Sequence, residues 1–335
     1  LVSAPTASGK TLIAMLAMFS FLSKNNGKVV YLSPLRALAA EKFTEFKKLE
    51  KIALGKKIKV GISTGDFDGI EKNLDNSDIL ILTNEKMDSV IRHGVEWIDE
   101  IGLVISDEVH LIGDENRGPT LEMILTQLKL LDSKPQIVGL SATITNSDEI
   151  ANWLDCKLVK NDWRPVPLSE GVCDGGEVTM NDGNIFDVER SLRGTPIDLG
   201  VQSVKQGGQS LVFAETRTRS KSLATKAADV ISQMLKKNEL KELEKTSKKI
   251  LSQNENTEIV KTLAILVKKG VAFHHAGLNQ NCREIIEKEF RNGTIKLLSS
   301  TPTLAAGVNL PARRVVISNI NRYNAKIGRN MPISI

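Results

Sequence analysis

A phosphate-binding loop at the start of the chain constrains its fold more than any other feature. Residues Ala4 to Thr11 read Ala-Pro-Thr-Ala-Ser-Gly-Lys-Thr, and an apolar run from Leu12 to Leu22 follows. In such a loop small residues expose backbone N–H groups to phosphate oxygens, the lysine meets the outer phosphates, and the last hydroxyl binds Mg²⁺. The dipole of the following helix also favours an anion. The predicted nucleotide-binding residues are Pro5, Thr6, Ala7, Ser8, Gly9, Lys10 and Thr11, with Thr11 also a metal ligand.

The loop lies so close to the first residue that the chain looks like a piece of a longer protein. A phosphate loop follows a buried strand, yet only Leu1, Val2 and Ser3 precede Ala4, and the first residue is not Met. Ala4 also replaces the glycine that usually opens the loop, although it keeps the position small. The alternative interpretation is a chance turn, because short motifs also occur by coincidence.

Composition limits the kinds of protein that the chain can be. Its 335 residues, 41% hydrophobic and 25% charged, suit a soluble protein with two domains. The run Leu12–Leu22 is too short to cross a bilayer, so we expect a buried helix and no membrane partner. Three widely separated cysteines without disulfide or zinc spacing indicate a reducing, cytoplasmic location. The net charge of +5 permits a nucleic-acid partner without requiring one, and only 4% aromatic residues argue against a broad base-stacking surface.

Alternating strands and helices predict an α/β fold with two tandem domains. The predicted strands of the first half are 28–33, 58–63, 79–83, 103–106 and 136–141, with helices that include 35–52 and 84–93. Continuous apolar strands separated by helices are typical of a parallel sheet covered on both faces. The segment 162–167 contains two prolines that favour extended backbone, so we place the domain boundary there. The expected domains are 1–166 and 167–335.

The second half repeats this architecture without a phosphate loop of its own. It begins with a predicted hairpin at 177–186 that turns at Asn181-Asp182-Gly183. The strands predicted after it are 210–214, 271–273, 296–299 and 314–318, with helices near 216–238 and 279–291. The stretch 235–256 is rich in Lys and Glu with few apolar anchors, so we expect exposed helix and loop there.

A second group of chemically active residues follows the predicted strand 103–106. Asp107, Glu108 and His110 come directly after this apolar run. Ligands of open α/β sheets bind beyond the carboxyl ends of the strands, so these residues should face Lys10. Asp107 is predicted to hold Mg²⁺, and Glu108 to orient and deprotonate an attacking water. The alternatives are a solvated acidic turn for the carboxylates and, for His110, either a structural histidine or a link to the second domain.

Small hydroxyl residues end the predicted strand 136–141. The hydroxyls of Ser141 and Thr143 can hydrogen-bond the acidic loop and relay its state to the second domain. A helix N-cap is the competing interpretation, and this short segment alone does not decide between the two.

Taken in order along the chain, these segments resemble the motifs of superfamily two helicases. In the first half the segments that resemble motifs I, Ia, Ib, II and III are Ala4–Thr11, Pro34–Ala39, Thr83–Lys86, Asp107–His110 and Ser141–Thr143. In the second half the segments that resemble motifs IV, IVa and V of the Ski-type branch are 211–217, 273–278 and 300–311. Within that branch, Trp163–Leu168 and motif V are most similar to archaeal Hjm/Hel-type DNA repair helicases. The resemblance implies two tandem RecA-like domains, each a mostly parallel sheet covered by helices.

The resemblance also implies where a polynucleotide contacts the chain. In the family, motifs Ia, Ib, IV and V grip the phosphate backbone, which suits a motor that moves along any sequence. Carried over to this chain, these contacts fall on Pro34, Arg36, Thr83, Asn84, Thr216, Arg217, Thr301 and Thr303. The competing interpretations are surface cations for the arginines and helix caps for the threonines. Gly307 and Asn309 match positions that approach ATP from the second domain, although Asn309 stands where many relatives have Asp.

The end of the chain departs from a complete enzyme of this family. Residues 317–335 resemble the start of a strand-separating β-hairpin, with Arg322 and Tyr323 near its tip. Motif VI, whose arginine reaches the γ-phosphate, should follow, and loss of an arginine finger costs roughly 10³–10⁵ in rate in related systems. We therefore expect this chain by itself to bind nucleotide weakly and to hydrolyse it slowly.

The resemblance implies an ATP- and Mg²⁺-dependent helicase that moves 3′-to-5′ on single-stranded, forked or branched DNA in replication-coupled repair and recombination, with hydrolysis where its two domains meet. A Ski-type RNA helicase is an alternative, because no residue of the sequence reveals whether the 2′-OH is sensed. A nucleotide-gated clamp that binds nucleic acid without unwinding it is a second alternative. A small-molecule P-loop kinase would need one domain and a lid, and the second α/β half argues against it.

Overall fold

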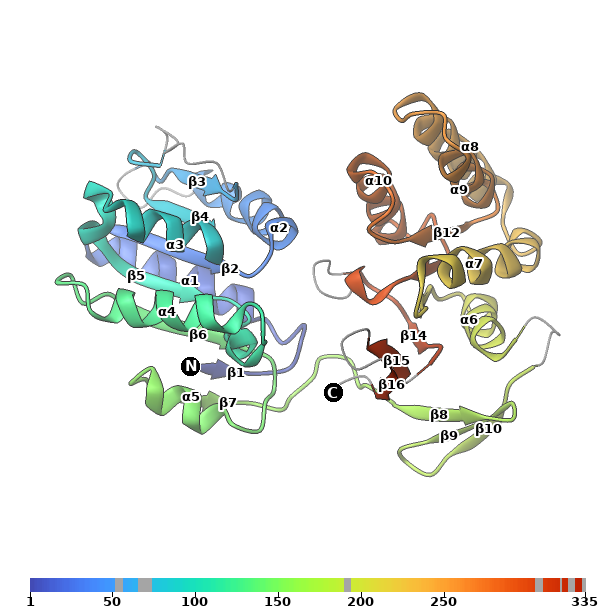
Figure 1. Ribbon diagram of the computed structural model, residues 1–335, viewed down its shortest axis with the longest axis horizontal. Helices are drawn as coiled ribbons and strands as arrows, with labels where there is room; N and C mark the ends of the chain where they lie inside the picture. Colours follow the sequence, from blue (N-terminus) through green and yellow to red (C-terminus); the bar gives the residue numbers. More distant parts are fainter. Residues whose placement is uncertain are drawn as a thin grey trace. The chain divides into compact units, whose positions relative to one another are not determined.

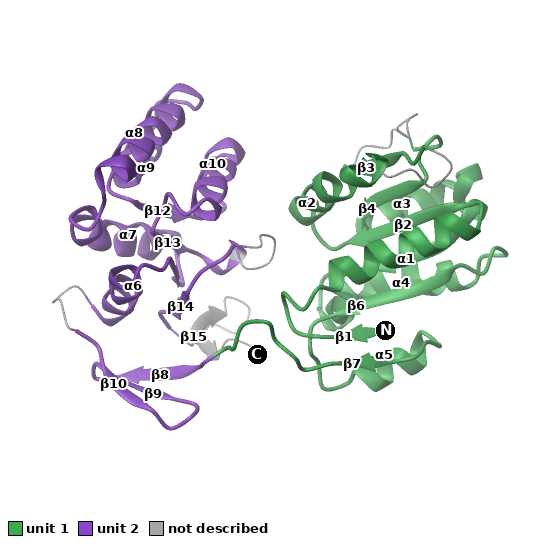
Figure 2. Ribbon diagram, turned by 180° about the vertical axis from the view of Figure 1, so that it is seen from behind, with its two compact units in different colours: residues 1–168 green, residues 169–335 purple. Residues whose placement is uncertain are grey.

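The computed structural model describes residues 1–51, 57–65, 74–189, 194–304, 310–319, 321–324 and 329–332 (Figure 1). The chain divides into two compact units, Leu1–Leu168 and Ser169–Ile335 (Figure 2), which we describe one at a time. Each contains a parallel sheet with helices packed against it, so the predicted α/β class is confirmed. Among the described residues, no helix combines the length and the apolar character that crossing a bilayer requires.

The first unit is built on a seven-stranded parallel sheet. In chain order its strands are β1 (Val2–Ser3), β2 (Lys28–Ser33), β3 (Val60–Ser63), β4 (Ile79–Thr83), β5 (Ile101–Ser106), β6 (Gln136–Ser141) and β7 (Val159–Lys160). In space the order is β3-β4-β2-β5-β6-β1-β7, and every neighbouring pair is parallel. Strands β2 and β4 are buried along their whole length, as their continuous apolar sequences require.

Helices cover both faces of this sheet and form a separate apolar core on each (Figures 1 and 2). One face carries α1 (Lys10–Lys24) and α2 (Arg36–Phe46), and the other carries α3 (Asn84–His93), α4 (Gly118–Lys129) and α5 (Ser147–Trp153). The 3₁₀ turns of this unit are η1 (Lys47–Lys51), η2 (Glu96–Glu100) and η3 (Val109–Gly113). The helix predicted at 35–52 therefore ends at Phe46 and continues as η1.

Helix α1 is only half buried, so the prediction of a buried helix at Leu12–Leu22 is wrong for its outer side. Ala14, Met18 and Leu22 recur every fourth residue and pack on the sheet. Leu12 and Leu16 are 58% and 59% exposed. An apolar run does not reveal this difference, because a crossover helix needs only one apolar stripe to cover a sheet.

The second unit has a four-stranded parallel sheet in the order β12-β13-β11-β14. Its strands are β11 (Ser210–Phe213), β12 (Val271–His274), β13 (Leu297–Ser300) and β14 (Arg314–Ile317). The helical elements are α6 (Thr195–Lys205), α7 (Arg217–Ser232), α8 (Lys237–Ser252), α9 (Glu258–Lys268), α10 (Gln280–Arg291) and η4 (Pro302–Leu304). One apolar core joins these helices to the sheet, with Phe273 and Phe290 fully buried within it.

Several parts of the second unit differ from the prediction. The hairpin predicted at 177–186 belongs to a three-stranded antiparallel sheet of β8 (Gly171–Asp174), β9 (Glu177–Met180) and β10 (Ile185–Asp187), and β8 was not expected. Helices α6 and α9 were not expected either. The stretch 235–256 forms α8, whose Leu243 and Ile250 are fully buried, because a few apolar residues at helical spacing suffice to dock a charged helix. Strands β15 (Asn321–Asn324) and β16 (Arg329–Pro332) pair antiparallel, and Arg322 and Tyr323 lie within β15.

Two substitutions on α1 test this burial pattern. Met18→Ala should lower the free energy of unfolding of the first unit by about 2–5 kcal/mol, because it leaves a cavity in a fully buried site. Leu16→Ala removes an exposed side chain from the same helix and should change that free energy by about 0.5 kcal/mol or less. All three tryptophans of the chain lie within the first unit, so tryptophan fluorescence during urea unfolding reports on that unit. Equal losses of unfolding free energy in Met18→Ala and Leu16→Ala would contradict this burial pattern.

Candidate nucleotide site and neighbouring motif residues

The sequence motifs of the first unit meet at one edge of its sheet. The phosphate loop follows β1, the acidic residues follow β5, and Ser141 ends β6, which lies between those two strands. The register pairs Ser3 with Ser141, so the ends of β1 and β6 are level. Because all seven strands are parallel, their carboxyl ends lie at this same edge, where open α/β sheets bind ligands.

The phosphate loop has a backbone that suits an anion. Gly9 adopts a left-handed conformation with φ 89° and precedes α1, and Ala7 is also left-handed at φ 64°. A side chain at Gly9 would meet open space, so this glycine is required for its backbone angle rather than for room. Helix α1 has no side-chain cap and no acidic residue in its first turn, which leaves its N-terminal dipole available to a negative charge. Within the described residues, the buried hydroxyl of Ser8 has no hydrogen-bond partner.

Lys10 is anchored on the same loop. Its Nζ donates hydrogen bonds to the carbonyl oxygens of Ala4 at 2.7 Å and Pro5 at 3.0 Å. Burial lowers the pKa of Lys10, while the negative charges of Glu108 and Asp107 act in the opposite direction. The ammonium therefore lies within electrostatic reach of both carboxylates, as the sequence predicted.

The Asp107 carboxylate is held through both of its oxygens. Oδ2 accepts a hydrogen bond of 2.5 Å from the Tyr31 hydroxyl, and Oδ1 accepts one of 3.0 Å from the Glu108 backbone N–H. Burial and the charge of Asp107 raise the pKa of Tyr31 well above its usual value, so the phenol stays protonated and can only donate this bond. Asp107 is itself tied to β2, because its N–H donates to the Leu32 carbonyl at 2.9 Å.

Glu108 has the properties of a general base. It adopts a left-handed backbone conformation with φ 49°, which turns the chain sharply after β5. Burial and the neighbouring Asp107 raise the pKa of Glu108, whereas Lys10 and Lys42 lower it. A carboxylate with a raised pKa accepts a proton more readily, which is what water activation requires.

His110 connects the acidic turn to the end of β6. Its Nδ1 lies 3.4 Å from the Ala142 backbone N–H and 3.4 Å from Glu108 Oε2. Burial lowers the pKa of His110, and the charge of Lys10 lowers it further. The ring is therefore neutral near pH 7, so Nδ1 accepts from Ala142 and the contact with Glu108 is not an ion pair.

The segment Ser141–Thr143 reaches the acidic turn differently from the prediction. The hydroxyl of Ser141 donates to the Ala142 carbonyl at 2.9 Å, and Ser3 donates to the same oxygen at 3.3 Å. Thr143 is exposed. The connection to the acidic turn therefore runs through the Ala142 backbone and His110, and the Ser141 hydroxyl does not make it.

Two residues of this site were not predicted. Tyr31 binds Asp107, and Nζ of Lys42 donates a hydrogen bond of 2.6 Å to the Thr11 hydroxyl. A signal existed for Tyr31, because it is the one aromatic residue of β2 and carries a hydroxyl that needs a partner when it is buried. Lys42 gave none, since lysines recur throughout this part of the chain and most of them are solvated.

The residues at this edge suit a nucleotide-bound Mg²⁺ ion. Among the described residues, no group of three or more His, Cys, Asp or Glu side chains could form a metal cage of its own. The Thr11 hydroxyl and the Asp107 carboxylate instead supply hard oxygen atoms beside the phosphate loop. Mg²⁺ is commonly held in this way, by one or two protein oxygens together with substrate phosphates and water.

The predicted nucleic-acid contacts of the first unit are mostly buried. Pro34, Thr83 and Asn84 are buried, and Arg36 is exposed. Thr83 Oγ1 accepts from the Lys86 N–H at 3.3 Å and caps α3, which is the competing interpretation given for threonines. A capping hydroxyl still has a proton to donate, so capping does not by itself exclude a phosphate contact.

In the second unit, motif residues gather around the start of α7. Thr216 and Arg217 are exposed, and Thr216 Oγ1 caps α7 by accepting from the Arg219 N–H at 3.1 Å. A Cβ on Gly277 would lie 3.2 Å from Arg217 Nη1, so motif IV and motif IVa are neighbours. Thr301 is buried, and its N–H donates to the His274 carbonyl at 3.1 Å. Gly307, Asn309 and the side chain of Thr303 lie outside the described residues.

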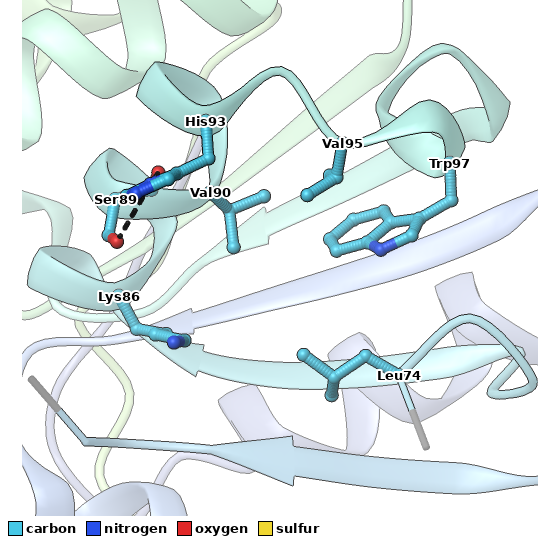
Figure 3. Close-up of a pocket in the computed structure, with 7 residues that line it drawn as sticks. All are labelled: Leu74, Lys86, Ser89, Val90, His93, Val95 and Trp97. Atoms are coloured by element: carbon cyan, nitrogen blue, oxygen red, sulfur yellow. Dashed lines mark hydrogen bonds between the residues drawn. The ribbon is translucent and has the colours of Figure 1, made fainter. Parts of the chain in front are cut away.

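A separate small pocket of the first unit contains none of the predicted site residues (Figure 3). It is lined by Leu74, Lys86, Ser89, Val90, His93, Val95 and Trp97. His93 Nδ1 lies 2.7 Å from the Ser89 carbonyl oxygen, so this ring nitrogen already has a hydrogen-bond partner within α3. The lining is largely apolar and offers no acidic group for a metal ion.

Comparison with known proteins identifies the class of this chain. The DEAD/DEAH box helicase family model matches residues 1–150, and the helicase conserved C-terminal domain model matches residues 232–326. The two units are therefore the RecA-like domains of a superfamily 2 helicase.

Individual relatives identify the branch. The chain is 42% identical over 340 residues to the ATP-dependent DNA helicase Hel308 of Methanocella arvoryzae. The match covers 100% of this chain and 45% of that protein. It is 43% identical over 333 residues to Hel308 of Pyrococcus horikoshii, covering 99% of this chain and 44% of that protein. The chain is therefore similar along its whole length to Hel308-type helicases, and it spans less than half the length of these relatives.

The raised pKa of Glu108 predicts a pH-dependent gain in stability for Glu108→Gln. A carboxyl group whose pKa is higher in the folded than in the unfolded protein destabilises the fold once the pH exceeds the folded pKa. Removing its charge should therefore raise the Tm of the first unit at about pH 8. The gain should shrink toward about pH 4, where the wild-type side chain is protonated in the folded protein.

Glu50→Gln is the matched control. Burial alone would raise the pKa of Glu50, but hydrogen bonds from Lys47 and the Val60 N–H lower it overall. Its charge thus stabilises the fold at neutral pH, and this variant should lose Tm at about pH 8. A Glu108→Gln gain that is the same at both pH values would show that the Glu108 charge is not destabilising.

Proposed function

We propose that this protein is an ATP- and Mg²⁺-dependent DNA helicase that acts inside the cell. It moves 3′-to-5′ on single-stranded DNA and opens forked or branched DNA in replication-coupled repair and recombination. One observation carries the proposal: the phosphate loop, the Lys10 ammonium and the Asp107 and Glu108 carboxylates meet at one sheet edge. The similarity to helicases named ATP-dependent DNA helicase Hel308 supports DNA as the substrate. The polarity and the repair role are extended from the resemblance to that family.

The roles of the residues follow from their positions. Lys10 exchanges its two carbonyl partners for phosphate oxygens, which form stronger charge-assisted hydrogen bonds. Thr11 and Asp107 hold Mg²⁺, which supplies positive charge against the phosphates when it is bound. Glu108 orients a water molecule and accepts its proton, helped by its raised pKa.

His110 provides the path by which a change at the acidic turn reaches β6. A proton taken up by Glu108 alters the charge 3.4 Å from His110 Nδ1, and the same nitrogen contacts the Ala142 N–H. The ring is therefore placed to pass a change in the position of Glu108 to the backbone after Ser141. This arrangement favours the coupling role over a purely structural histidine.

Backbone contacts supply the grip on the polynucleotide. Arg36 and Arg217 are exposed cations at the carboxyl ends of β2 and β11, which is where parallel sheets bind ligands. Contacts to phosphates carry no base information and so suit movement along any sequence. Gly307 and Asn309 remain the predicted nucleotide contacts of the second unit.

Loss of the lysine ammonium tests the nucleotide site. Lys10→Ala in the full-length protein should lower DNA-dependent ATP hydrolysis by at least about 10²-fold, because a preorganised charge facing the transferred phosphate is removed. Lys24→Ala changes an exposed lysine at the other end of the same helix and should hydrolyse ATP like the wild type. Unchanged turnover in Lys10→Ala would show that this lysine does not serve the phosphates.

Strand displacement with the same proteins separates the helicase from its alternatives. The wild type should open a forked DNA duplex in the presence of ATP and Mg²⁺, and Lys10→Ala should not. Faster opening of a matched RNA duplex would identify a Ski-type RNA helicase instead. Tight DNA binding without displacement by the wild type would identify a clamp.

Salt dependence tests the backbone grip. The logarithm of single-stranded DNA affinity should fall linearly with the logarithm of salt concentration, and Arg217→Ala should reduce the slope by about 0.7 if one phosphate contact is lost. Lys245→Ala removes an exposed lysine of α8 outside the motifs and should leave the slope unchanged. Fluorescence anisotropy of a labelled oligonucleotide measures both, and equal slopes in all three proteins would exclude Arg217 as a phosphate contact.

A further inference from the structure

We infer that Tyr31 and Lys42 are positioning residues that hold the two proposed metal ligands, Asp107 and Thr11, in place by hydrogen bonds. The inference rests on the proposed function, because it takes the metal-binding roles of Asp107 and Thr11 as given. Neither residue falls within the sequence motifs described above. Tyr31 precedes the segment Pro34–Ala39 and Lys42 follows it, so one strand–loop–helix segment supplies both hydrogen bonds.

Tyr31 does more than fill the core. Its ring is fully buried and packs edge-on against Phe46 of α2, with 5.1 Å between centroids. Phenylalanine would fill the same space without a buried hydroxyl, which must find a partner. The hydroxyl has Asp107 Oδ2 as that partner at 2.5 Å. With Glu108 N–H on Oδ1, the carboxylate is fixed from the protein side, and each oxygen keeps a further lone pair for a metal ion or its water.

Lys42 fixes the other proposed ligand in the same manner. Its side chain is only 12% exposed, although lysine normally keeps its ammonium in water. Nζ donates to Thr11 Oγ1 at 2.6 Å and lies 3.2 Å from Glu45 Oε2. Two partners therefore fix the position of this ammonium. A threonine hydroxyl that accepts one hydrogen bond keeps a second lone pair and its own proton, which are what a metal ion and a phosphate oxygen require.

The donors of the two hydrogen bonds lie on neighbouring elements, β2 and α2, which pack against each other. Tyr31 lies in β2, Lys42 lies in α2, and the Tyr31–Phe46 contact joins them. Partners behind metal ligands orient those ligands, and their loss commonly weakens metal affinity about 10–100-fold. Loss of either partner should therefore weaken Mg²⁺ binding more than nucleotide binding.

The test measures the Mg²⁺ requirement of the full-length protein. Tyr31→Phe and Lys42→Met should each raise the Mg²⁺ concentration for half-maximal ATP hydrolysis at least about tenfold. A second readout does not depend on activity. The affinity for a fluorescent ADP should fall in both variants when Mg²⁺ is present and match the wild type when EDTA removes it.

Lys47→Met is the matched control for Lys42→Met. Lys47 pairs with Glu50 at 2.7 Å across the same three-residue spacing as Lys42 and Glu45, and it lies in the adjoining turn η1. This variant should keep the wild-type Mg²⁺ requirement. Tyr31→Phe retains the buried ring, so its Tm should stay close to that of the wild type.

Two outcomes would overturn the inference. One is an unchanged Mg²⁺ requirement in both variants while Lys10→Ala loses ATP hydrolysis as proposed. That result would show that the two hydrogen bonds do not position the ligands. A lowered Tm with equal losses of ADP affinity in Mg²⁺ and in EDTA would identify packing roles only. If Lys10→Ala hydrolyses ATP like the wild type, the proposed role of this site fails, and this result is distinct from both.

Discussion

The parallel register of the seven-stranded sheet is the constraint on which the site of the first unit depends. Hydrogen bonding between parallel strands aligns their carboxyl ends, so loops that are far apart in the chain leave the sheet at one edge. The phosphate loop after β1 and the acidic turn after β5 are separated in space only by β6. Each crossover helix also covers one face of the sheet, which buries the strands and leaves the edge open to ligands.

Charge balance at this edge explains how the site tolerates several partly buried ionisable groups. Burial disfavours the charged forms of Lys10 and Glu108, and each reduces the effect for the other. Tyr31 and His110 stay neutral and serve as a fixed donor and a fixed acceptor. Lys42 adds a second cation that acts on Glu108 and contacts Thr11. The site therefore combines charges that can respond to a ligand with neutral groups that keep their geometry.

The second unit uses the same principle with a smaller sheet. Its four parallel strands also align their carboxyl ends, and the motif residues Thr216 and Thr301 follow β11 and β13. The hydroxyls of Thr83 and Thr216 both cap helices, one in each unit. Helix capping and phosphate contact are therefore not exclusive explanations for a threonine in these motifs, since one hydroxyl can accept from the helix and donate to a ligand.

The sequence by itself determined the α/β class, most strands and helices, and the residues around Lys10, Asp107 and Glu108, because short-range periodicity and motif spacing record them directly. It did not reveal that α1 exposes Leu12 and Leu16, or that α8 docks through Leu243 and Ile250, because burial depends on what lies opposite each helix. Only the tertiary structure brought Tyr31 to Asp107 and Lys42 to Thr11. Contacts between residues 76 and 31 positions apart are decided by strand order and helix packing, and local sequence carries no record of either.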